Sequence, residues 1–478
     1  MRPKVVSVAV VFATTLLSSC YLAHEPPVDS AVPGREVGAA PAICAVAMRP
    51  GAYGRQALVG GPSWYLDTQN WYSYGGECAG QVAWASRAGR LFLAMADVDQ
   101  RDFPFEHHGW LAARVSVVES DGGCWSTIAS ISTDRAPSSE PGFYGSHPIA
   151  VRSDGAVALL NLQMGSMNNL NEIRESMSGD WQIRVLANPP YPAFGDGGTA
   201  AFLGDLLVIQ AYWGTPIAVI GSQSALFPSI EVSGEYVLRG PLLFAQADYV
   251  RNRTARTASL AGASGSRLLA RVVDLDIGGG RTAEGEPRDV LVETYRLDDP
   301  TTLVPLSRIA LPLALNDHPH GATVTPPALA LSDDGGLLAV GASVSTEHED
   351  APPITLVDLA HGNTTIPIHG SLVGHELPWC PTPQTVAVAA EGNLVAWVSA
   401  DPAGTGTVAN VAERVGDAFE LRWTGRPTVT DSAPCQGQVD VESLAIAPDG
   451  ALAVVGRTAC SAGEWGDALG AVRVFILQ

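Results

Sequence analysis

Histidine and carboxylate side chains gather in a few short segments and could together hold a divalent metal ion. Six of the ten histidines lie between residues 318 and 375. Imidazole and carboxylate ligands in combination suit zinc or manganese. The residues assigned to this metal site are Asp317, His318, His320, His348 and His375. Their spacing matches no known metal motif. The favoured interpretation is therefore a set of solvated loops without a cofactor, and the metal site is the alternative.

A second group of residues could bind a ligand without catalysis. Exposed aromatic rings offer flat apolar area to sugars and peptides. The rings expected in or beside the loops of one face are Trp71, Tyr72, Trp110, Trp213, Trp379 and Trp465. Tryptophans that fill space between sheets are the alternative, and we expect that role for Trp84 and Trp397, which lie on strands.

No set of residues supports a catalytic assignment. The run SDGGCW (120–125) resembles the aspartate box of sialidase propellers, but its Asp is one residue too close to the Trp. The box occurs once, and the arginine triad of such enzymes cannot be assigned. We therefore expect a non-enzymatic protein and name no catalytic residue. An extracytoplasmic hydrolase or lyase that uses the acidic, His-rich loops is the alternative function.

The elements that must position these residues are short strands in a repeated hairpin. The turn glycines of successive copies lie 49 to 70 residues apart. Apolar alternation with period two on both sides of such turns predicts antiparallel strand pairs. The copies span 82–95, 149–162, 200–210, 259–272, 329–342, 386–399 and 444–457. A second, outer hairpin follows in several copies, as at 113–132 and 290–311.

The pattern LxxSxDGxxLAVG, clearest at 329–341, resembles the blade core of WD40-like and TolB-like bacterial β-propellers. The resemblance covers most of residues 80–478, although no copy carries the Trp-Asp dipeptide. It implies an all-β propeller of about seven four-stranded antiparallel blades. A jelly roll or stacked sandwich is the structural alternative. In a propeller, the longer loops share one face, and most of the unusual residues above fall in them.

The end of the chain predicts how such a ring closes. The last hairpin is followed by the strand 471–478 alone, so the final blade lacks a fourth strand. Propellers usually take the missing strand from the other end of the chain, which removes an exposed sheet edge. The expected donor lies within 42–66, where two segments are strand-like.

The N-terminal residues predict export from the cytoplasm. Basic residues and an apolar run of 13 residues (Val5–Leu17) form a signal sequence. The following Leu-Ser-Ser-Cys resembles the bacterial lipobox, with Cys20 as the acylated residue. We therefore predict a signal peptide at 1–19, a lipidated Cys and flexible tether at 20–41, and a propeller domain at 42–478. Tyr21 follows the Cys, and the lack of Asp at this position resembles lipoproteins sorted to the outer membrane in didermal hosts. A secretory signal with a chance Cys is the alternative.

Charge and cysteine content limit the partners. The formal charge of −21 argues against nucleic acid, because phosphate binding needs a positive surface. The expected partners are the membrane, through the lipid, and an envelope protein or glycan on the loop face; we expect a monomer. An even number of remaining cysteines in an exported protein favours disulfides among Cys44, Cys78, Cys124, Cys380, Cys435 and Cys460, with the pairing left open.

Overall fold

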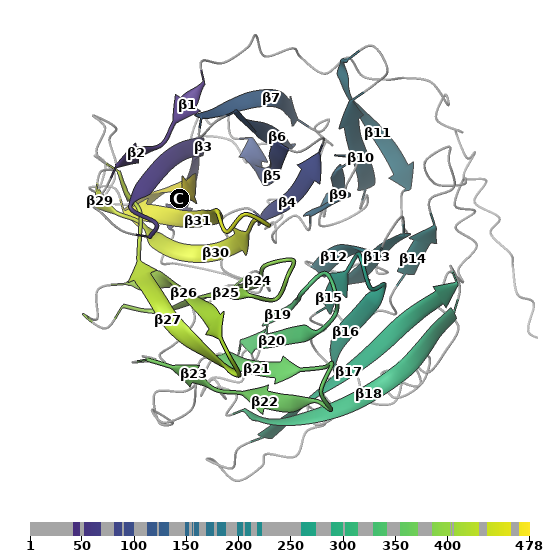
Figure 1. Ribbon diagram of the computed structural model, residues 1–478. Helices are drawn as coiled ribbons and strands as arrows, with labels where there is room; N and C mark the ends of the chain where they lie inside the picture. The colour runs from purple at the N-terminus through teal and green to yellow at the C-terminus, as the bar shows by residue number, and fades with distance from the viewer. Residues whose placement is uncertain are drawn as a thin grey trace, which may run out of the picture.

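The computed structural model consists of β-strands joined by turns (Figure 1). No residue in the part of the chain that it describes is helical, so the all-β prediction is confirmed for that part. The described residues are 42–47, 52–67, 81–87, 90–99, 112–121, 124–132, 149–152, 155, 157–161, 169–175, 179–187, 198–203, 206–211, 218–221, 260–273, 288–299, 302–313, 328–341, 354–370, 385–401, 403, 406–429, 437–459 and 468–478.

Each of the seven predicted hairpins is present as an antiparallel strand pair, and each begins one sheet. We number these sheets one to seven along the chain. The pairs are β4 (Gln81–Arg87) with β5 (Arg90–Asp99), β8 (Ile149–Val151) with β9 (Val157–Asn161), β12 (Gly198–Leu203) with β13 (Leu206–Ala211), β15 (Leu260–Ala263) with β16 (Leu268–Val273), β19 (Ala328–Leu331) with β20 (Leu337–Gly341), β24 (Val386–Val388) with β25 (Leu394–Ala400), and β30 (Asp440–Ile446) with β31 (Leu452–Ala459).

Further strands extend each hairpin in antiparallel order. They are β6 (Ala112–Asp121) and β7 (Cys124–Ser132) in the first sheet, β10 (Asn169–Glu175) and β11 (Trp181–Ala187) in the second, β14 (Ala218–Gly221) in the third, β17 (Arg288–Asp299) and β18 (Thr302–Leu313) in the fourth, β21 (Ile354–Asp358) and β22 (Thr364–Ile366) in the fifth, β26 (Thr407–Val415) and β27 (Ala418–Gly425) in the sixth, and β32 (Ala468–Leu477) in the seventh.

The expectation of four strands per sheet needs correction. Among the described residues the third sheet has three strands, whereas the first, sixth and seventh have five. The extra strands are short segments that cover outer edges: β1 (Ile43–Cys44), β2 (Val46–Ala47) and β23 (Ile368–His369). Such pairing satisfies backbone groups that an outermost strand would otherwise expose. A separate two-stranded sheet, β28 (Thr428–Val429) with β29 (Gly437–Gln438), connects the sixth sheet to the seventh.

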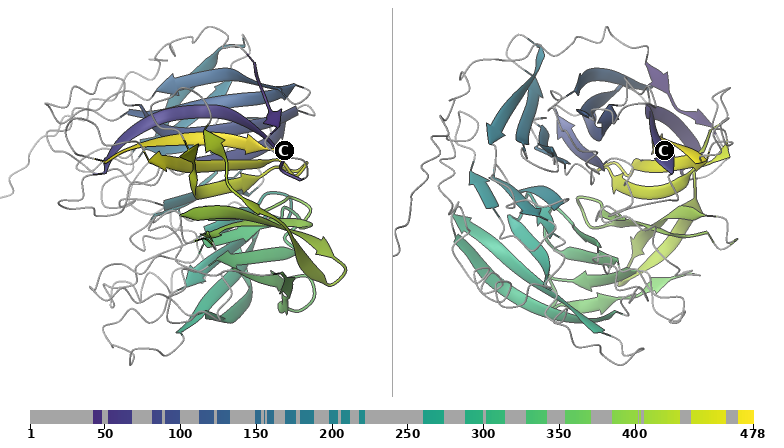
Figure 2. Two further views of the ribbon diagram at one scale, coloured as in Figure 1. Left: turned by 90° about the vertical axis from the view of Figure 1, so that its left-hand side faces the viewer. Right: turned by 180° about the vertical axis from the view of Figure 1, so that it is seen from behind.

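The innermost strands of consecutive sheets lie next to one another. β4 packs beside β8, and the same relation continues through β12, β15, β19, β24 and β30, whose further neighbour is β4. The seven sheets therefore follow one another around a circle (Figure 1). Figure 2 shows the same arrangement from the side and from behind.

The N-terminal segment supplies the fourth strand of the seventh sheet, as the sequence predicts. β3 (Arg55–Asp67) pairs antiparallel with β32, from Gln56 opposite Leu477 to Asp67 opposite Ala468. In Figure 1 the purple β3 lies along the yellow strands of the C-terminus. Strand β3 from the N-terminal part of the chain and the last strand, β32, thus belong to one sheet.

The apolar core lies between neighbouring sheets. Each of five clusters of buried side chains joins residues of two sheets that follow each other around the circle. Leu338 and Val357 of the fifth sheet, for example, pack with Ala270 and Val292 of the fourth. Trp397 is 2% exposed and fills space between the fifth and sixth sheets, which confirms the structural role expected for it.

Candidate functional site

The residues predicted to bind a ligand or a metal lie outside the described part of the chain. This applies to the aromatic set Trp71, Tyr72, Trp110, Trp213, Trp379 and Trp465, and to the metal set Asp317, His318, His320, His348 and His375. Cys20 and the predicted signal and tether lie outside it as well. Among the residues that are described, no three His, Cys, Asp or Glu side chains come together as a metal site would require.

The described strands have two sets of ends, which lie on opposite sides of the ring of sheets. We call the side with the tight turns between first and second strands the turn face, and the opposite side the loop face. Because the strands alternate in direction, each second strand ends, and each third strand begins, at the loop face. The predicted ligand-binding loops leave from these strand ends.

A buried arginine joins the sixth and seventh sheets near the loop face. Arg426 follows β27, and its side chain is only 9% exposed. Its guanidinium nitrogens lie 3.0 Å from Asp401 Oδ2, after β25, and 3.2 Å from Asp440 Oδ1, at the start of β30. The Thr407 hydroxyl donates across the same boundary to the Val441 carbonyl at 2.6 Å. These contacts fix the ends of strands from two different sheets relative to each other.

A second charged pair, Glu442 with Arg457, lies in the seventh sheet close to Asp440. Glu442 is the extra residue of a β-bulge, because the register shifts between Val441 and Ser443. Its carboxylate forms an ion pair with Arg457 on the neighbouring strand, and both side chains are mostly buried. Bulges turn a side chain out of the regular alternation and are common beside binding sites. Buried pairs of this kind keep the two charges satisfied but are weak evidence for added stability.

The turn face is held together by hydrogen bonds between neighbouring hairpins. Asp333 of the fifth sheet accepts bonds from Gly265 N at its carboxylate, 2.9 Å, and from Ser266 N at its carbonyl, 3.0 Å. Its own N–H donates to Ala390 O of the sixth sheet at 2.9 Å. One Asp-Gly turn therefore links three consecutive sheets.

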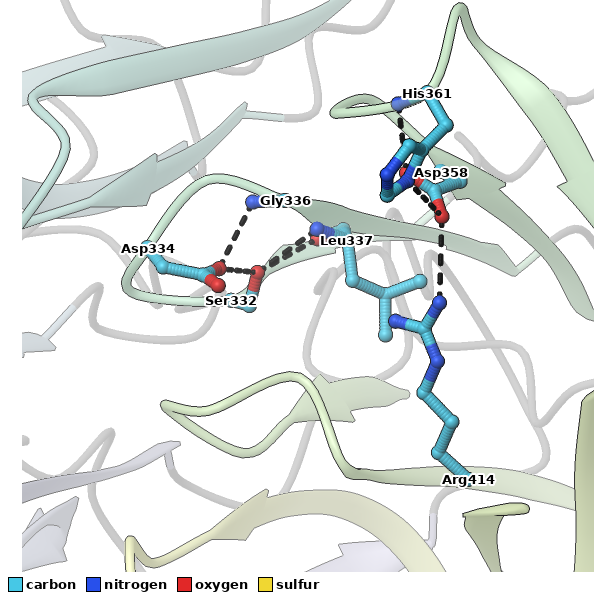
Figure 3. A network of polar contacts seen from close by, with 7 residues as sticks. All are labelled: Ser332, Asp334, Gly336, Leu337, Asp358, His361 and Arg414. Atoms are coloured by element: carbon cyan, nitrogen blue, oxygen red, sulfur yellow. Dashed lines mark hydrogen bonds and ion pairs between the residues drawn. The ribbon is translucent and has the colours of Figure 1, made fainter. Parts of the chain in front are cut away.

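Figure 3 shows how this turn is built. Ser332 is fully buried, and its hydroxyl accepts a bond from Leu337 N at 2.9 Å and donates to Asp334 Oδ1 at 2.5 Å. The same Asp334 oxygen accepts from Gly336 N at 2.8 Å. Ser332 and Asp334 of the repeat pattern thus serve the turn itself.

An Asp–His–Arg contact is the other network in Figure 3. His361 donates from its backbone N to Asp358 Oδ1, and its ring Nδ1 lies 3.0 Å from the same oxygen. Arg414 of the sixth sheet lies 3.3 Å from Asp358 Oδ2. Burial raises the pKa of Asp358, but the hydrogen bonds from His361 and Arg414 outweigh it, so the pKa is lower than usual. Asp358 closes a turn and joins two sheets.

The fourth sheet carries a charged row on its side away from the fifth sheet. Arg271, Glu293 and Arg308 are opposite one another on β16, β17 and β18. Arg308 Nε and the Tyr295 hydroxyl both donate to Glu293. Burial lowers the pKa of Arg271, and burial followed by the bond to Glu293 raises that of Tyr295. The row holds two arginines and one glutamate, so it has one formal positive charge in excess.

One disulfide is present among the described cysteines. Cys44 of β1 and Cys124 of β7 are bonded and are also opposite each other in the strand register. The prediction of disulfides is therefore confirmed for this pair, and Cys78, Cys380, Cys435 and Cys460 lie outside the described residues.

Comparison with known proteins shows similarity at the level of structure. No protein-family model matches the sequence, and no curated protein matches it significantly. Hydrazine synthase of Kuenenia stuttgartiensis is 11% identical with a TM-score of 0.44, over 82% of this chain and 95% of that chain. The β-propeller domain of the Trilobed protease of Pyrococcus furiosus is 7% identical with a TM-score of 0.38, over 80% and 92%. Similarity this low supports no inference about activity, and the description of the fold depends on the sheet order above.

The buried charged networks are not evident from the sequence. Arg426 and Glu442 stand in otherwise ordinary strand contexts, and only the chain's return from β27 to β30 brings Arg426 to Asp440. A charged residue within an apolar strand, as in VESLAI (441–446), was the available signal.

The described part of the chain contains no helix long and apolar enough to cross a membrane.

Proposed function

We propose that the chain is a lipid-anchored protein of the cell envelope that binds a protein or a glycan without catalysis. In this proposal residues 42–478 form a β-propeller of about seven blades, held through the tether 20–41 to a lipid on Cys20. The signal peptide 1–19 directs export, and the anchor lies in the outer membrane where the host has one.

The observation that carries this proposal is the fixing of the strand ends at the loop face. Arg426 joins ends from two sheets there. On the opposite face, Asp333 joins three consecutive sheets. A frame fixed at both faces can present the connections between its strands to a ligand with little ordering cost. The aromatic residues that the sequence places in those connections supply the contact area.

Affinity capture from detergent-solubilised envelopes tests the binding function. The full-length protein is compared with the double variant Trp110→Ala/Trp379→Ala and with Leu306→Ala. Leu306 is a suitable control because it is 47% exposed and lies within strand β18 rather than in a connection between strands. We expect wild type and Leu306→Ala to retain the same partner, and the double variant to lose it about tenfold or more.

The same three proteins passed over immobilised envelope polysaccharide distinguish a glycan from a protein partner. Retention of wild type and Leu306→Ala, with loss of the double variant, identifies the glycan. Equal behaviour of all three proteins in both assays would refute a binding role for the loop aromatics.

A further inference from the structure

The N-terminal segment crosses the boundary at which the first and seventh sheets meet. β1 pairs with β7 of the first sheet, whereas β2 and β3 belong to the seventh. Ala45, between β1 and β2, is 8% exposed and packs in a cluster with Val82 and Leu93 of the first sheet and Val455 of the seventh. One short stretch of chain therefore holds the outer side of this boundary.

The non-covalent attachment of β1 is small. β1 comprises two residues, opposite Trp125 and Cys124, and β2 comprises two more. β3, in contrast, pairs with β32 from Gln56 to Asp67. Since β1 contributes so few hydrogen bonds, the Cys44–Cys124 bond is the main link that keeps it on the first sheet.

The disulfide is accessible to solvent on one side and lies next to an unsatisfied buried group on the other. Cys44 is exposed and Cys124 is half-buried. Trp125, the neighbour of Cys124, is 1% exposed, and its Nε1 has no hydrogen-bond partner among the described groups. A buried donor without a partner is unfavourable, because nothing replaces the hydrogen bond that it would make with water. Ile43 and Ala45 pack in the same apolar cluster as Trp125, so departure of β1 would remove part of the cover of this indole.

We propose that the Cys44–Cys124 disulfide is a redox-operated latch on the boundary between the first and seventh sheets. A dithiol reductant attacks the exposed bond and forms a mixed disulfide. Its second thiol then displaces the remaining protein sulfur. The S–S bond of the protein is replaced by two thiols, and the reductant leaves as a disulfide, with two electrons and two protons transferred.

Opening the latch releases β1 while the ring of sheets persists. β3 stays paired with β32. The inner side of the boundary also stays closed, because Trp84 Nε1 of the first sheet donates to Ala445 O of the seventh at 3.0 Å. The consequence of reduction is a newly exposed edge on β7 beside Trp125. Outermost strand edges are sites where another extended chain can pair.

Hydrogen exchange measured by mass spectrometry on the full chain tests the latch. The protein is compared before and after treatment with dithiothreitol, and with the double variant Cys44→Ser/Cys124→Ser. The variant isolates this bridge from any other cysteine pair. We expect about tenfold faster exchange in peptides covering 43–47 and 124–129, both on reduction and in the variant.

Peptides from β25 and from β3 with β32 are the internal reference and should not change. Reoxidation of the wild type should restore slow exchange at 43–47. Unchanged exchange at 43–47 and 124–129 in the double variant would overturn the latch. Faster exchange in every peptide would also overturn it, because the disulfide would then hold the whole fold.

Discussion

Replacing Ile476 with Ala tests whether the sheet that β3 forms with β32 and β31 contributes to the global stability of the protein. Ile476 lies on β32 between Ala57 of β3 and Ala453 of β31, and it is fully buried. Its side chain packs in the cluster that joins the seventh sheet to the first. Removal of a buried Ile side chain to Ala costs about 3 kcal/mol, within a usual range of roughly 2–5. Ile476→Val removes one methyl group and should cost about 1 kcal/mol.

Urea unfolding followed by circular dichroism measures these costs. The control is Val415→Ala, because Val415 is 43% exposed at a turn of the sixth sheet and its loss should change stability by less than about 0.5 kcal/mol. We expect a single unfolding transition for each protein. Its midpoint urea concentration should be highest for Val415→Ala, lower for Ile476→Val and lowest for Ile476→Ala. A cost for Ile476→Ala no larger than the control would refute the closing sheet. A separate early transition would mean that this sheet unfolds without the others.

Two further predictions concern the turns. Gly335 and Gly362 both have positive φ, 74° and 81°. A Cβ added to Gly335 would lie 2.5 Å from Ser266 Oγ of the fourth sheet, whereas a Cβ added to Gly362 would meet nothing within 4 Å. Both Ala variants should lose about 1 kcal/mol from backbone strain, and Gly335→Ala should lose about 1 kcal/mol more in urea unfolding; equal losses would mean that the hairpins do not touch. Asp358 has a lowered pKa in the folded state, so its stabilising effect is present above the unfolded value near pH 4 and is lost as pH falls through the folded value. Asp358→Asn should therefore be destabilised by about 1 kcal/mol at pH 7, and its difference from wild type should shrink as the pH falls below about 4, as judged by thermal unfolding across this range; a pH-independent difference would assign the effect to packing.

The hairpins could be predicted from the sequence because their information is local. In LALSDDGGLLAVG (329–341) the apolar alternation, the Asp-Gly turn and the small residues of the second strand all act within a dozen residues. Closure by β3 was also predictable, because the last hairpin lacked a partner strand and the N-terminal segment was strand-like. The number of strands in each sheet could not be predicted. β1, β2 and β23 are two residues each, too short for any periodicity to identify.

Contacts between sheets could not be predicted for a different reason. The partners of Arg426 are at positions 401 and 440, and Asp358 meets Arg414 across 56 residues of chain. Such pairs depend on how far consecutive sheets rotate around the axis, and nothing in the local pattern encodes that angle. The Cys44–Cys124 pairing is of the same kind, since fifteen pairings were compatible with the sequence.

The turn-face contacts change how the acidity of the chain should be understood. In the sequence, Asp333 and Asp334 are two of the 49 acidic residues that make the chain acidic. In the structure each accepts backbone N–H bonds, so their charge stabilises turns and joins sheets. Asp401 and Asp440 are likewise engaged by Arg426. These four carboxylates keep their negative charge, but their oxygens are engaged by backbone N–H groups or by Arg426 and are therefore not free to coordinate a cation. Of these four residues only Asp401 and Asp440 lie near the loop face, so we expect a ligand there to be selected by aromatic contact and shape rather than by coordination to these carboxylates.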